Sequence, residues 1–378
     1  MKNLLDKMRI DHWWGSFISF IMSLVYLYIM IFDIQFNGKS FLLIIFSLLT
    51  TIGFVSFGYL INEIFDIKDD IKAGKPNRLF GTSKKTIVFY LIGSLILVFL
   101  PWLYLPSSYK TWWLIGGELV LFLLYSMPFP KLKKVPVLST LVDTAYAYIF
   151  PPVLAFITYA SWANHTMELY SFAYLLIWLF IVGFRNIFIH QIDDISYDKA
   201  SGIRTLPMII GITFSNVLLI GSIIVEPVIF ILAIDTLVQI NPITYIATIA
   251  LFMITLNSIV TNEEPYQGKF FAISTFRNLY DPFYQAFWPI ILIIGLAVFY
   301  DVHWLWLLVV HFTLFIQNTQ SIYQRLKSWY QWTHSGVKNA LYKLGHYSIS
   351  HILLIFGVNL KERNMSVLDY FNQVLGRK

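Results

Sequence analysis

The feature that most constrains this chain is a series of apolar runs, each about as long as a bilayer is thick. A helix that spans the hydrocarbon core needs about 20 mostly apolar residues, and unpaired backbone groups are costly there. Such runs lie near residues 13–32, 41–63, 86–105, 112–127, 137–158, 169–190, 207–235, 242–260, 283–300 and 303–321. They predict an all-α fold, a polytopic transmembrane helical bundle. Within the seventh run, Glu226-Pro227 indicates a kink or a division into two pieces.

The composition agrees with this class. Hydrophobic residues make up 57% of the 378 residues and charged residues 13%, whereas soluble domains carry about 25% charged residues. The chain has no cysteine, which excludes disulfides and thiolate metal ligands. The first run, from Trp13 to Phe32, is too long for the apolar part of a signal peptide. We therefore expect it to be retained as the first transmembrane helix.

Lysine and arginine residues predict the orientation. If the N-terminus is cytoplasmic, nearly all of them lie in cytoplasmic segments, and the loops on the other side hold only Lys39 and Lys110. Basic cytoplasmic loops are typical of membrane proteins. We expect the N-terminus, the loops that carry the polar motifs and the C-terminal tail to be cytoplasmic. The net charge of +6 then reflects a surface attracted to anionic lipid, and no nucleic-acid partner is expected.

Acidic residues are scarce, yet they gather at two places. The first follows the second run, where Asn62, Asp66 and Asp70 are spaced four residues apart. The second follows the sixth run, where Asp194 and Asp198 repeat this spacing. On a helix, residues four apart share a face, and like charges at that spacing repel. Both places are on the predicted cytoplasmic side, so two acidic stripes can face each other across the bundle.

The chemistry of these stripes suits a divalent cation. Mg²⁺ prefers oxygen ligands and binds few protein carboxylates together with substrate phosphates. We therefore predict that the stripes hold Mg²⁺ on a diphosphate. The alternative, a pair of solvated acidic helix ends, leaves the matched spacing and the shared side unexplained. Basic residues that flank the stripes are candidates for binding phosphate oxygens, although cytoplasmic loops are basic in any membrane protein.

The motifs resemble those of the UbiA superfamily of intramembrane prenyltransferases. The family's first signature, Asn-Asp-x-x-Asp-x-x-x-Asp, is matched by Asn62, Asp66 and Asp70, with Glu63 in place of the usual aspartate. Its second, Asp-x-x-x-Asp, is matched by Asp194 and Asp198. Other family-like positions are Arg9, Lys75, Arg78, Tyr125, Lys131, Gly202, Thr205 and Pro207. The resemblance covers roughly residues 5–300.

The resemblance implies a fold and a reaction. The fold is a bundle of nine core helices, here followed by a tenth helix and an interfacial C-terminal tail. This divides the chain into a prenyltransferase-like domain at 1–300 and, at 301–378, an extra helix with an amphipathic cytoplasmic tail. The reaction is the Mg²⁺-dependent transfer of an isoprenyl group from a prenyl diphosphate to a small-molecule acceptor, often an aromatic ring, within the bilayer.

Residue roles follow from the same resemblance. The implied metal ligands are Asn62, Asp66, Asp70, Asp194 and Asp198. The implied substrate-binding residues are Arg9, Lys75, Arg78, Tyr125, Lys131 and Arg204. Among these, Asp66, Asp194, Lys131 and Arg78 are the candidate catalytic residues.

Ionisable groups at membrane depth are further candidates, because a bilayer makes them costly to keep. Arg185 lies one to two turns before His190 in the sixth run, and these two with Gln191 are predicted to bind substrate. Asp143 is a candidate partner for Arg185. Glu118 and Glu226 are candidate partners of neighbouring hydroxyls, with a functional role as the alternative. Asp281 lies at the entry to the ninth run, where it is either a helix N-terminal carboxylate or part of the cavity mouth.

Three other functions stay open. A terpene cyclase of the same superfamily would use the same metal site but consume no acceptor. A divalent-cation transporter would place its carboxylates near the bilayer midplane and often has inverted repeats, which this sequence does not indicate. A structural scaffold leaves the paired stripes unexplained. Compatible acceptors include quinone precursors, other aromatic acids, chlorophyll-type or haem rings and a sugar phosphate, and prenyl length is not indicated.

Overall fold

The structure, a computed structural model, describes residues 6–165, 169–237 and 280–334, with a few single positions beyond them. All regular elements in these ranges are helices. Seven stretches are long and apolar enough to cross a membrane: Ile10–Ile31, Gly38–Ala73, Lys84–Leu103, Pro136–Trp162, Phe172–Asp193, Ile212–Asp235 and Tyr280–Phe299. The predicted polytopic helical bundle is therefore confirmed, and the chain is an integral, multi-pass membrane protein.

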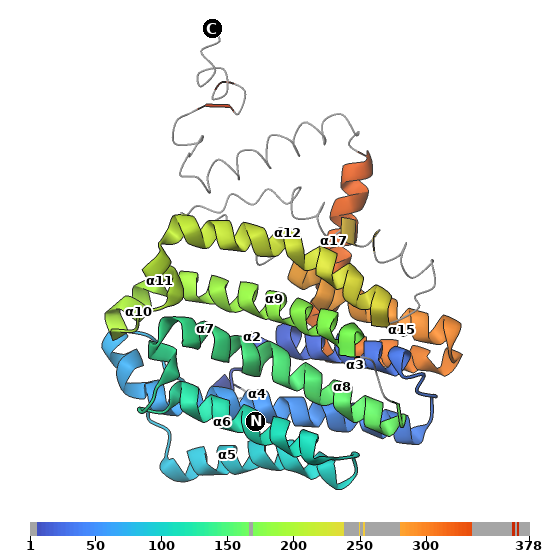
Figure 1. The fold of residues 1–378 in the computed structure, drawn as a ribbon, viewed down its shortest axis with the longest axis horizontal. Coiled ribbons are helices and arrows are strands. Elements are labelled where there is room, and N and C mark those ends of the chain that lie inside the picture. Colours follow the sequence, from blue (N-terminus) through green and yellow to red (C-terminus); the bar gives the residue numbers. More distant parts are fainter. Residues whose placement is uncertain are drawn as a thin grey trace.

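The long helices lie side by side along one common direction (Figure 1). They are α3 (Ser19–Ile31), α4 (Gly38–Ala73), α5 (Lys84–Phe99), α6 (Tyr109–Ser126), α8 (Phe150–Trp162), α9 (Leu169–Asp193), α12 (Ile212–Leu237) and α15 (Trp288–Phe299). The short helix α7 (Pro136–Thr144) leads into α8. At one end of the bundle, α10 (Ile195–Ser201) and α11 (Leu206–Ile210) join α9 to α12 (Figure 1).

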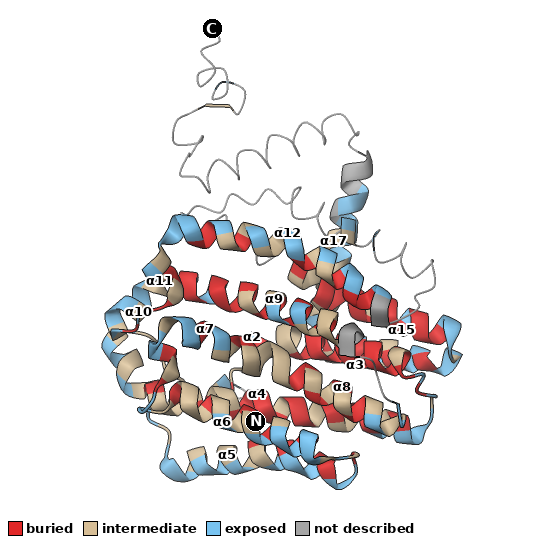
Figure 2. Ribbon diagram, in the orientation of Figure 1, coloured by how far each residue is buried: buried red, intermediate tan, exposed pale blue. Residues whose placement is uncertain are grey.

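The core forms around α3, in which every residue from Ser19 to Met30 is buried. Figure 2 shows the same buried character along α9 and α15, whereas α5 and α12 present many exposed residues on the outside of the bundle. The exposed residues of α5 include Val88, Phe89 and Ile92. Large apolar side chains on outer helices are what a lipid-facing surface requires, so the apolar runs serve both the core and the bilayer.

Helix α4 is the element that positions the first acidic stripe. It begins at a capping box, in which Asn37 accepts hydrogen bonds from the backbone N–H groups of Lys39 and Ser40. It ends at Gly74, which adopts φ 69°. Its 36 residues correspond to about 54 Å of helix, well beyond the bilayer core of about 30 Å. The stripe therefore lies on a continuous helix that projects past the hydrocarbon.

Two predicted spans differ from the observed helices. The seventh is interrupted at Gly211, which has φ 81°, and α12 continues through Pro227 without a break. Gly211 tolerates a conformation that closes one helix and opens the next, so the division falls there and not at the proline. The tenth run is divided at Phe315 into α16 (Trp306–Leu314) and α17 (Ile316–His334), and its apolar part, Val302–Leu314, is shorter than the spans. The predicted eighth span and most of the tail lie outside the described residues.

Helix α17 departs from the common direction of the bundle (Figure 1). Near its start, the Asn318 side-chain amide donates hydrogen bonds to the carbonyl oxygens of Gly15, at 2.8 Å, and Gln285, at 2.7 Å. These carbonyls belong to the first and the last of the seven candidate spans. The extra segment is thus hydrogen-bonded to both the first and the last of these spans.

Candidate active site

The first acidic stripe lies near the end of α4, as predicted. Asn62 accepts a hydrogen bond from the Ser126 hydroxyl at 3.4 Å. Asp66 is buried, and Asp70 accepts from the Asn77 amide at 2.9 Å. A helix places residues four apart on one face, so the three oxygen-bearing side chains form one continuous row.

The second stripe straddles a helix boundary. Helix α9 ends at Asp193, Asp194 is the N-cap of α10, and Asp198 lies within α10. The Asp198 N–H donates to the Asp194 carbonyl at 2.9 Å, so the spacing of four residues retains a helical backbone hydrogen bond. Asp194 and Asp198 therefore keep the helical spacing that was predicted, even though the long helix α9 ends at Asp193.

The two stripes end in the same way. After Asp70, the N–H of Lys75 donates to the Asp70 carbonyl and Gly74 takes a left-handed conformation. After Asp198, the N–H of Ile203 donates to the Asp198 carbonyl, and Gly202 has φ 70°. This is the Schellman arrangement, in which glycine at the position after the C-cap lets the chain turn back along the helix end. The turn after the first stripe leads to Lys75, which meets the second stripe, whereas Arg204, after the second stripe, is exposed.

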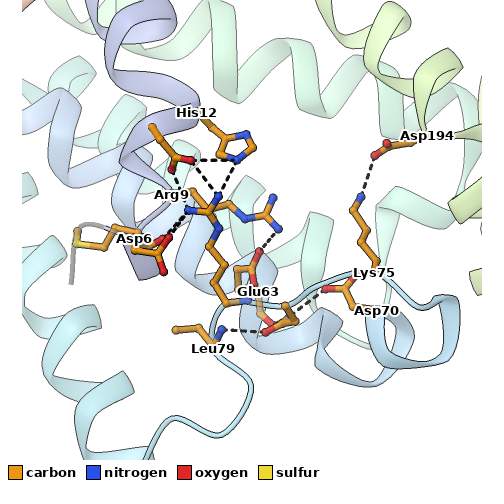
Figure 3. A network of polar contacts seen from close by, with 12 residues as sticks. Asp6, Arg9, His12, Glu63, Asp70, Lys75, Leu79 and Asp194 are labelled. Carbon is orange, nitrogen blue, oxygen red and sulfur yellow. Dashed lines mark hydrogen bonds and ion pairs between the residues drawn. The ribbon is translucent and has the colours of Figure 1, made fainter. Parts of the chain in front are cut away.

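Lys75 connects the two stripes. Its ammonium group lies 2.9 Å from a carboxylate oxygen of Asp194 (Figure 3). Helix α10 packs against α4, and the charges of Asp66 and Lys133 act on Asp198. The stripes therefore face each other at one end of the bundle, as their spacing and shared side predicted.

Two buried lysines come from the loop after α6. The Lys131 ammonium lies 2.6 Å from Asp69 and 3.8 Å from Asp66, and Lys133 also pairs with Asp66. Both lysines are at most 9% exposed. Lys131 was predicted to bind substrate, whereas Lys133 was not. The sequence carried only a weak signal for Lys133, because three lysines follow Pro130 and nothing local says which of them turns inward.

The two carboxylates of the second stripe repel each other, and the charges of Lys75 and Lys133 offset only part of this repulsion at Asp198. Burial, together with the charge of Asp194, raises the pKa of Asp198 to about 6. An ordinary aspartate in a folded protein has a pKa near 3.5. A cation that approaches both carboxylates would lower this pKa again, because an opposite charge favours the ionised form.

Glu63, which stands where the family has aspartate, acts as a connector. One carboxylate oxygen lies 2.6 Å from the Arg9 guanidinium, and the other accepts from the Arg78 backbone N–H at 2.8 Å (Figure 3). The Asn77 amide also donates to the Glu63 carbonyl at 2.9 Å. Glu63 therefore ties the N-terminal segment and the loop after α4 to the helix that bears the first stripe.

The predicted phosphate ligand Arg78 faces the N-terminal segment. Its guanidinium donates two hydrogen bonds to Asp11, at 2.9 and 3.0 Å, and another to Asp6 at 2.9 Å. It also lies 2.9 Å from the His12 ring (Figure 3). To bind a diphosphate, Arg78 would have to exchange these partners, so its role stays a prediction.

The remaining predicted residues have different surroundings. Tyr125 donates to Asp143 at 3.2 Å. Gln191 is buried, accepts from Thr140 at 3.0 Å and donates to Ser139 at 3.3 Å, which links α9 to α7. His190 and Arg204 are exposed.

The partners of Arg185 differ from the predicted one. Arg185 is fully buried, and its guanidinium lies 2.7 Å from Glu226 and 2.7 Å from Asp281. Asp143 instead accepts from Tyr125. The expected Arg185–Asp143 pair is therefore wrong, because α9 turns Arg185 toward α12 and toward Asp281 at the start of the Tyr280–Phe299 span, and not toward α7. Asp281 lies in the first turn of the Tyr280–Phe299 span, and its carboxylate pairs with Arg185.

The donor set fits a metal that is shared with phosphate. Within the described ranges, no three acidic or histidine side chains converge closely enough to hold a metal ion by themselves. The stripes offer carboxylate and amide oxygens, and lysines occupy several of them. Mg²⁺ commonly takes one or two protein carboxylates and completes its shell with water and substrate phosphates. The residues present fit such a partial shell better than an all-protein cage.

Comparisons with known proteins concern the sequence family and the fold. Residues 13–280 match the sequence profile of the UbiA prenyltransferase family. The apo structure of a UbiA homologue from Aeropyrum pernix K1 is similar, with a TM-score of 0.52 and 15% identity over 77% of this chain and 98% of that chain. No curated protein sequence matches the chain.

Two further structures lie at lower similarity. A UbiA homologue from Archaeoglobus fulgidus bound to DMAPP and Mg²⁺ has a TM-score of 0.45 and 16% identity, and the alignment covers 78% of this chain and 99% of that chain. A structure of digeranylgeranylglyceryl phosphate synthase has a TM-score of 0.47 and 18% identity, with 79% of this chain and 98% of that chain covered. At such identities the likeness concerns the fold alone. The family profile, however, spans more than half of the chain and includes both acidic stripes. The chain belongs to the UbiA prenyltransferase family.

Proposed function

We propose that this protein transfers an isoprenyl group from a prenyl diphosphate to a small-molecule acceptor in the membrane, with Mg²⁺ as cofactor. The observation that carries the proposal is the pair of acidic stripes, on α4 and α10, which face each other across basic side chains at one end of a transmembrane bundle. Such an arrangement supplies opposite charges for a diphosphate and its metal. The apolar bundle supplies surroundings suited to an isoprenyl chain.

Each part of the site has a proposed task. Asn62, Asp66, Asp70, Asp194 and Asp198 hold the metal on the diphosphate. Lys75 and Lys131, joined by the unpredicted Lys133, exchange their carboxylate partners for phosphate oxygens. Arg9, Arg78 and Arg204 add charge at the rim, and Tyr125, Arg185, His190 and Gln191 contribute to substrate binding. When bound, Mg²⁺ neutralises charge on the leaving diphosphate.

The reaction requires one bond to break and one to form. The allylic carbon–oxygen bond breaks, and both electrons leave with the diphosphate. The resulting allylic cation takes an electron pair from the acceptor, which then loses a proton. Buried lysines stabilise the developing negative charge, and aromatic side chains of the bundle stabilise the cation. The surrounding helices exclude water, which would otherwise capture the cation.

The proposal includes the domain division and the orientation. Residues 1–300 carry the chemistry, and residues 301–378 form the additional helical segment and tail. The N-terminus, the loops of the site and the tail face the cytoplasm, which the distribution of basic residues supports.

The test uses full-length protein in lipid nanodiscs. Diphosphate release is measured from a panel of allylic prenyl diphosphates with Mg²⁺ or with EDTA, and acceptor products are detected by mass spectrometry. We expect Mg²⁺-dependent release coupled to an acceptor that gains the prenyl mass. Release accompanied by a hydrocarbon and no modified acceptor would replace the transferase with a cyclase. Transport of Mg²⁺ across the bilayer with no release would contradict both.

A further inference from the structure

One carboxylate beside the acidic stripes has no basic partner among the described residues. Asp143, near the end of α7, accepts a hydrogen bond from the Tyr125 hydroxyl at 3.2 Å, and the Tyr146 hydroxyl donates to the same carboxylate. In the stripes, by contrast, Asp66 and Asp194 pair with lysines. Charges inside proteins are normally paired. A carboxylate that has only hydroxyl partners is therefore a natural site for a cation that arrives with a substrate.

This carboxylate lies next to the groups that would hold the diphosphate. Its donor Tyr125 directly precedes Ser126, whose hydroxyl lies 3.4 Å from the side-chain oxygen of Asn62 in the first stripe. The charges of Asp66 and Asp198, one from each stripe, both act on Tyr125. The Tyr125 side chain thus connects the space between the stripes with the carboxylate on α7.

Asp143 is also deeper in the bundle than the stripes. It is seven residues beyond the start of the Pro136–Trp162 span, which corresponds to about 10 Å along a helix. Lys133, which pairs with Asp66, precedes that span. A prenyl diphosphate that is held by the stripes and extends its apolar chain into the bundle has its allylic carbon between the stripes and Asp143.

Aromatic packing fixes the donors of this carboxylate. The Tyr146 ring packs against the rings of Phe122 and Tyr125, with centroids 4.6 and 5.5 Å apart. Phe122 in turn covers Gly58 of α4, where an added Cβ would lie 2.5 Å from the ring. Tyr146 lies on a π-helical turn, η4 (Ala145–Ile149), and such turns are rare and often mark functional sites. The two hydroxyls are therefore held in place by rings whose faces can themselves attract a cation.

We propose that Asp143, oriented by Tyr125 and Tyr146, is the anionic group that stabilises the allylic cation of the prenyl transfer. When the carbon–oxygen bond of the prenyl diphosphate breaks, both electrons leave with the diphosphate, and the positive charge on the allylic carbons faces Asp143. The carboxylate stays ionised and forms no bond, and the acceptor then supplies the electron pair. A fixed charge aimed at a charge that develops in the transition state accelerates the reaction. This proposal rests on the proposed function and deepens it by assigning a group to the cation.

The first measurement needs no acceptor, because it uses a stable mimic of the cation. Full-length protein in nanodiscs, with Mg²⁺ and inorganic pyrophosphate, is titrated with geranyltrimethylammonium, which is permanently cationic, and with geranyl methyl ether, which is uncharged. Calorimetry against empty nanodiscs gives both dissociation constants. We expect the cation to bind at least about tenfold more tightly than the ether, the effect of one interaction with a charged group.

Matched variants test whether Asp143 causes this preference. Asp143→Asn keeps the shape of the side chain and can still accept from both tyrosines, but it lacks the charge. It should reduce the preference for the cation about tenfold and leave the affinity for the ether unchanged. Asp33→Asn, at an exposed carboxylate between α3 and α4, is the control and should change neither constant. Melting curves establish that each variant is folded.

The second measurement follows the ionisation itself. In geranyl diphosphate with an isotope label at the bridging oxygen, the label moves to non-bridging positions when the carbon–oxygen bond breaks and re-forms, and phosphorus NMR detects the exchange. With Mg²⁺ and no acceptor, Asp143→Asn should slow the exchange about 10²-fold, the usual cost of losing one preorganised electrostatic contact. Tyr146→Phe keeps the ring and removes one hydrogen bond to the carboxylate, so it should slow the exchange about 2- to 10-fold.

The outcomes separate this inference from the proposed function. An unchanged preference for the cation in folded Asp143→Asn, or exchange at the parent rate, would overturn the role of Asp143. Equal losses of affinity for the cation and the ether would also overturn it, because that pattern indicates a purely structural residue. If the parent releases diphosphate normally, the transferase proposal survives each of these results. A cation preference that depends on Asp143, without release or exchange from any prenyl diphosphate, would support the cation site and contradict the transferase.

Discussion

Two clusters of oppositely charged side chains in the described part of the bundle differ in their exposure to solvent. At the rim of the bundle, Lys75 pairs with an Asp194 side chain that is 45% exposed, and the pair joins a loop to a short helix. Deeper in the bundle, Arg185 and Glu226 are both fully buried and lie on two long helices. A partly exposed pair costs little to separate, whereas a buried pair leaves an uncompensated charge when one partner is removed. The Lys75–Asp194 pair at the rim is therefore suited to exchanging partners with a ligand, and the buried cluster to maintaining a fixed shape.

The strongest test of this difference is the removal of the buried cation. Arg185→Met leaves Glu226 and Asp281 buried without a counter-charge, and we expect a loss of about 3–5 kcal/mol in stability. Thermal melting of the protein in nanodiscs measures the change. Arg204→Met, at an exposed position between α10 and α11, serves as the control and should melt like the parent. Equal melting of the two variants would show that the buried cluster is not a structural element.

At the rim, removing one member of a charged pair should reduce activity without affecting folding. Asp194→Ala removes a predicted metal ligand whose pairing with Lys75 is partly exposed. We expect diphosphate release to fall by about 10²–10³-fold, the usual cost of losing one preorganised electrostatic contact. The melting temperature should stay close to that of the parent. If diphosphate release is retained, Asp194 is not part of the site. The proposed difference in role between the two clusters is then also contradicted.

Neighbouring lysines sharpen the comparison within the rim. Lys133 is buried against Asp66, and Lys134 is exposed. Lys133→Met should reduce release about 10- to 100-fold, since it loses one charge-assisted contact to the diphosphate. Lys134→Met changes the same charge one residue away and should have little effect. Similar losses in both variants would point to a general effect of loop charge.

The raised pKa of Asp198 predicts the pH dependence of metal binding. A metal ligand must be deprotonated, and the pKa of Asp198 is about 6 in the metal-free protein. Mg²⁺ affinity should therefore be constant above pH 7 and fall about tenfold for each pH unit below 6, as the proton competes with the metal. Titration of Mg²⁺ by calorimetry at several pH values tests this. In Asp198→Asn the affinity should be lower and its fall below pH 6 less steep.

The smallest effect concerns the attachment of the extra segment. Asn318→Ala removes the two hydrogen bonds to Gly15 and Gln285, and we expect about 1 kcal/mol of destabilisation. Gln320→Ala, two residues further along α17, is the matched control. Truncation after residue 322 keeps Asn318 and should preserve release. A truncation that is folded but inactive would assign the tail a role in the reaction.

Hydropathy and residue spacing along the chain were enough to predict the fold class and the position of the first acidic stripe. The apolar runs determined the helical class, since length and hydropathy decide whether a helix can cross a bilayer. The spacing of Asn62, Asp66 and Asp70 determined one polar face of α4, because side-chain direction follows from helical periodicity. The family followed from the same residues, and so did the prediction that the stripes bind a metal. All of these properties depend on residues that are near one another in the chain.

Tertiary structure decided which distant groups meet. It placed Lys133 on Asp66, turned Arg78 toward Asp11, and paired Arg185 with Glu226 and Asp281 in place of Asp143. It also brought side chains from three π-helical segments, Trp14–Ile18, Ala145–Ile149 and Phe283–Phe287, close to one another. Partner choice between helices depends on their rotation and packing, and sequence spacing within one helix carries no information about the neighbour that its face will meet.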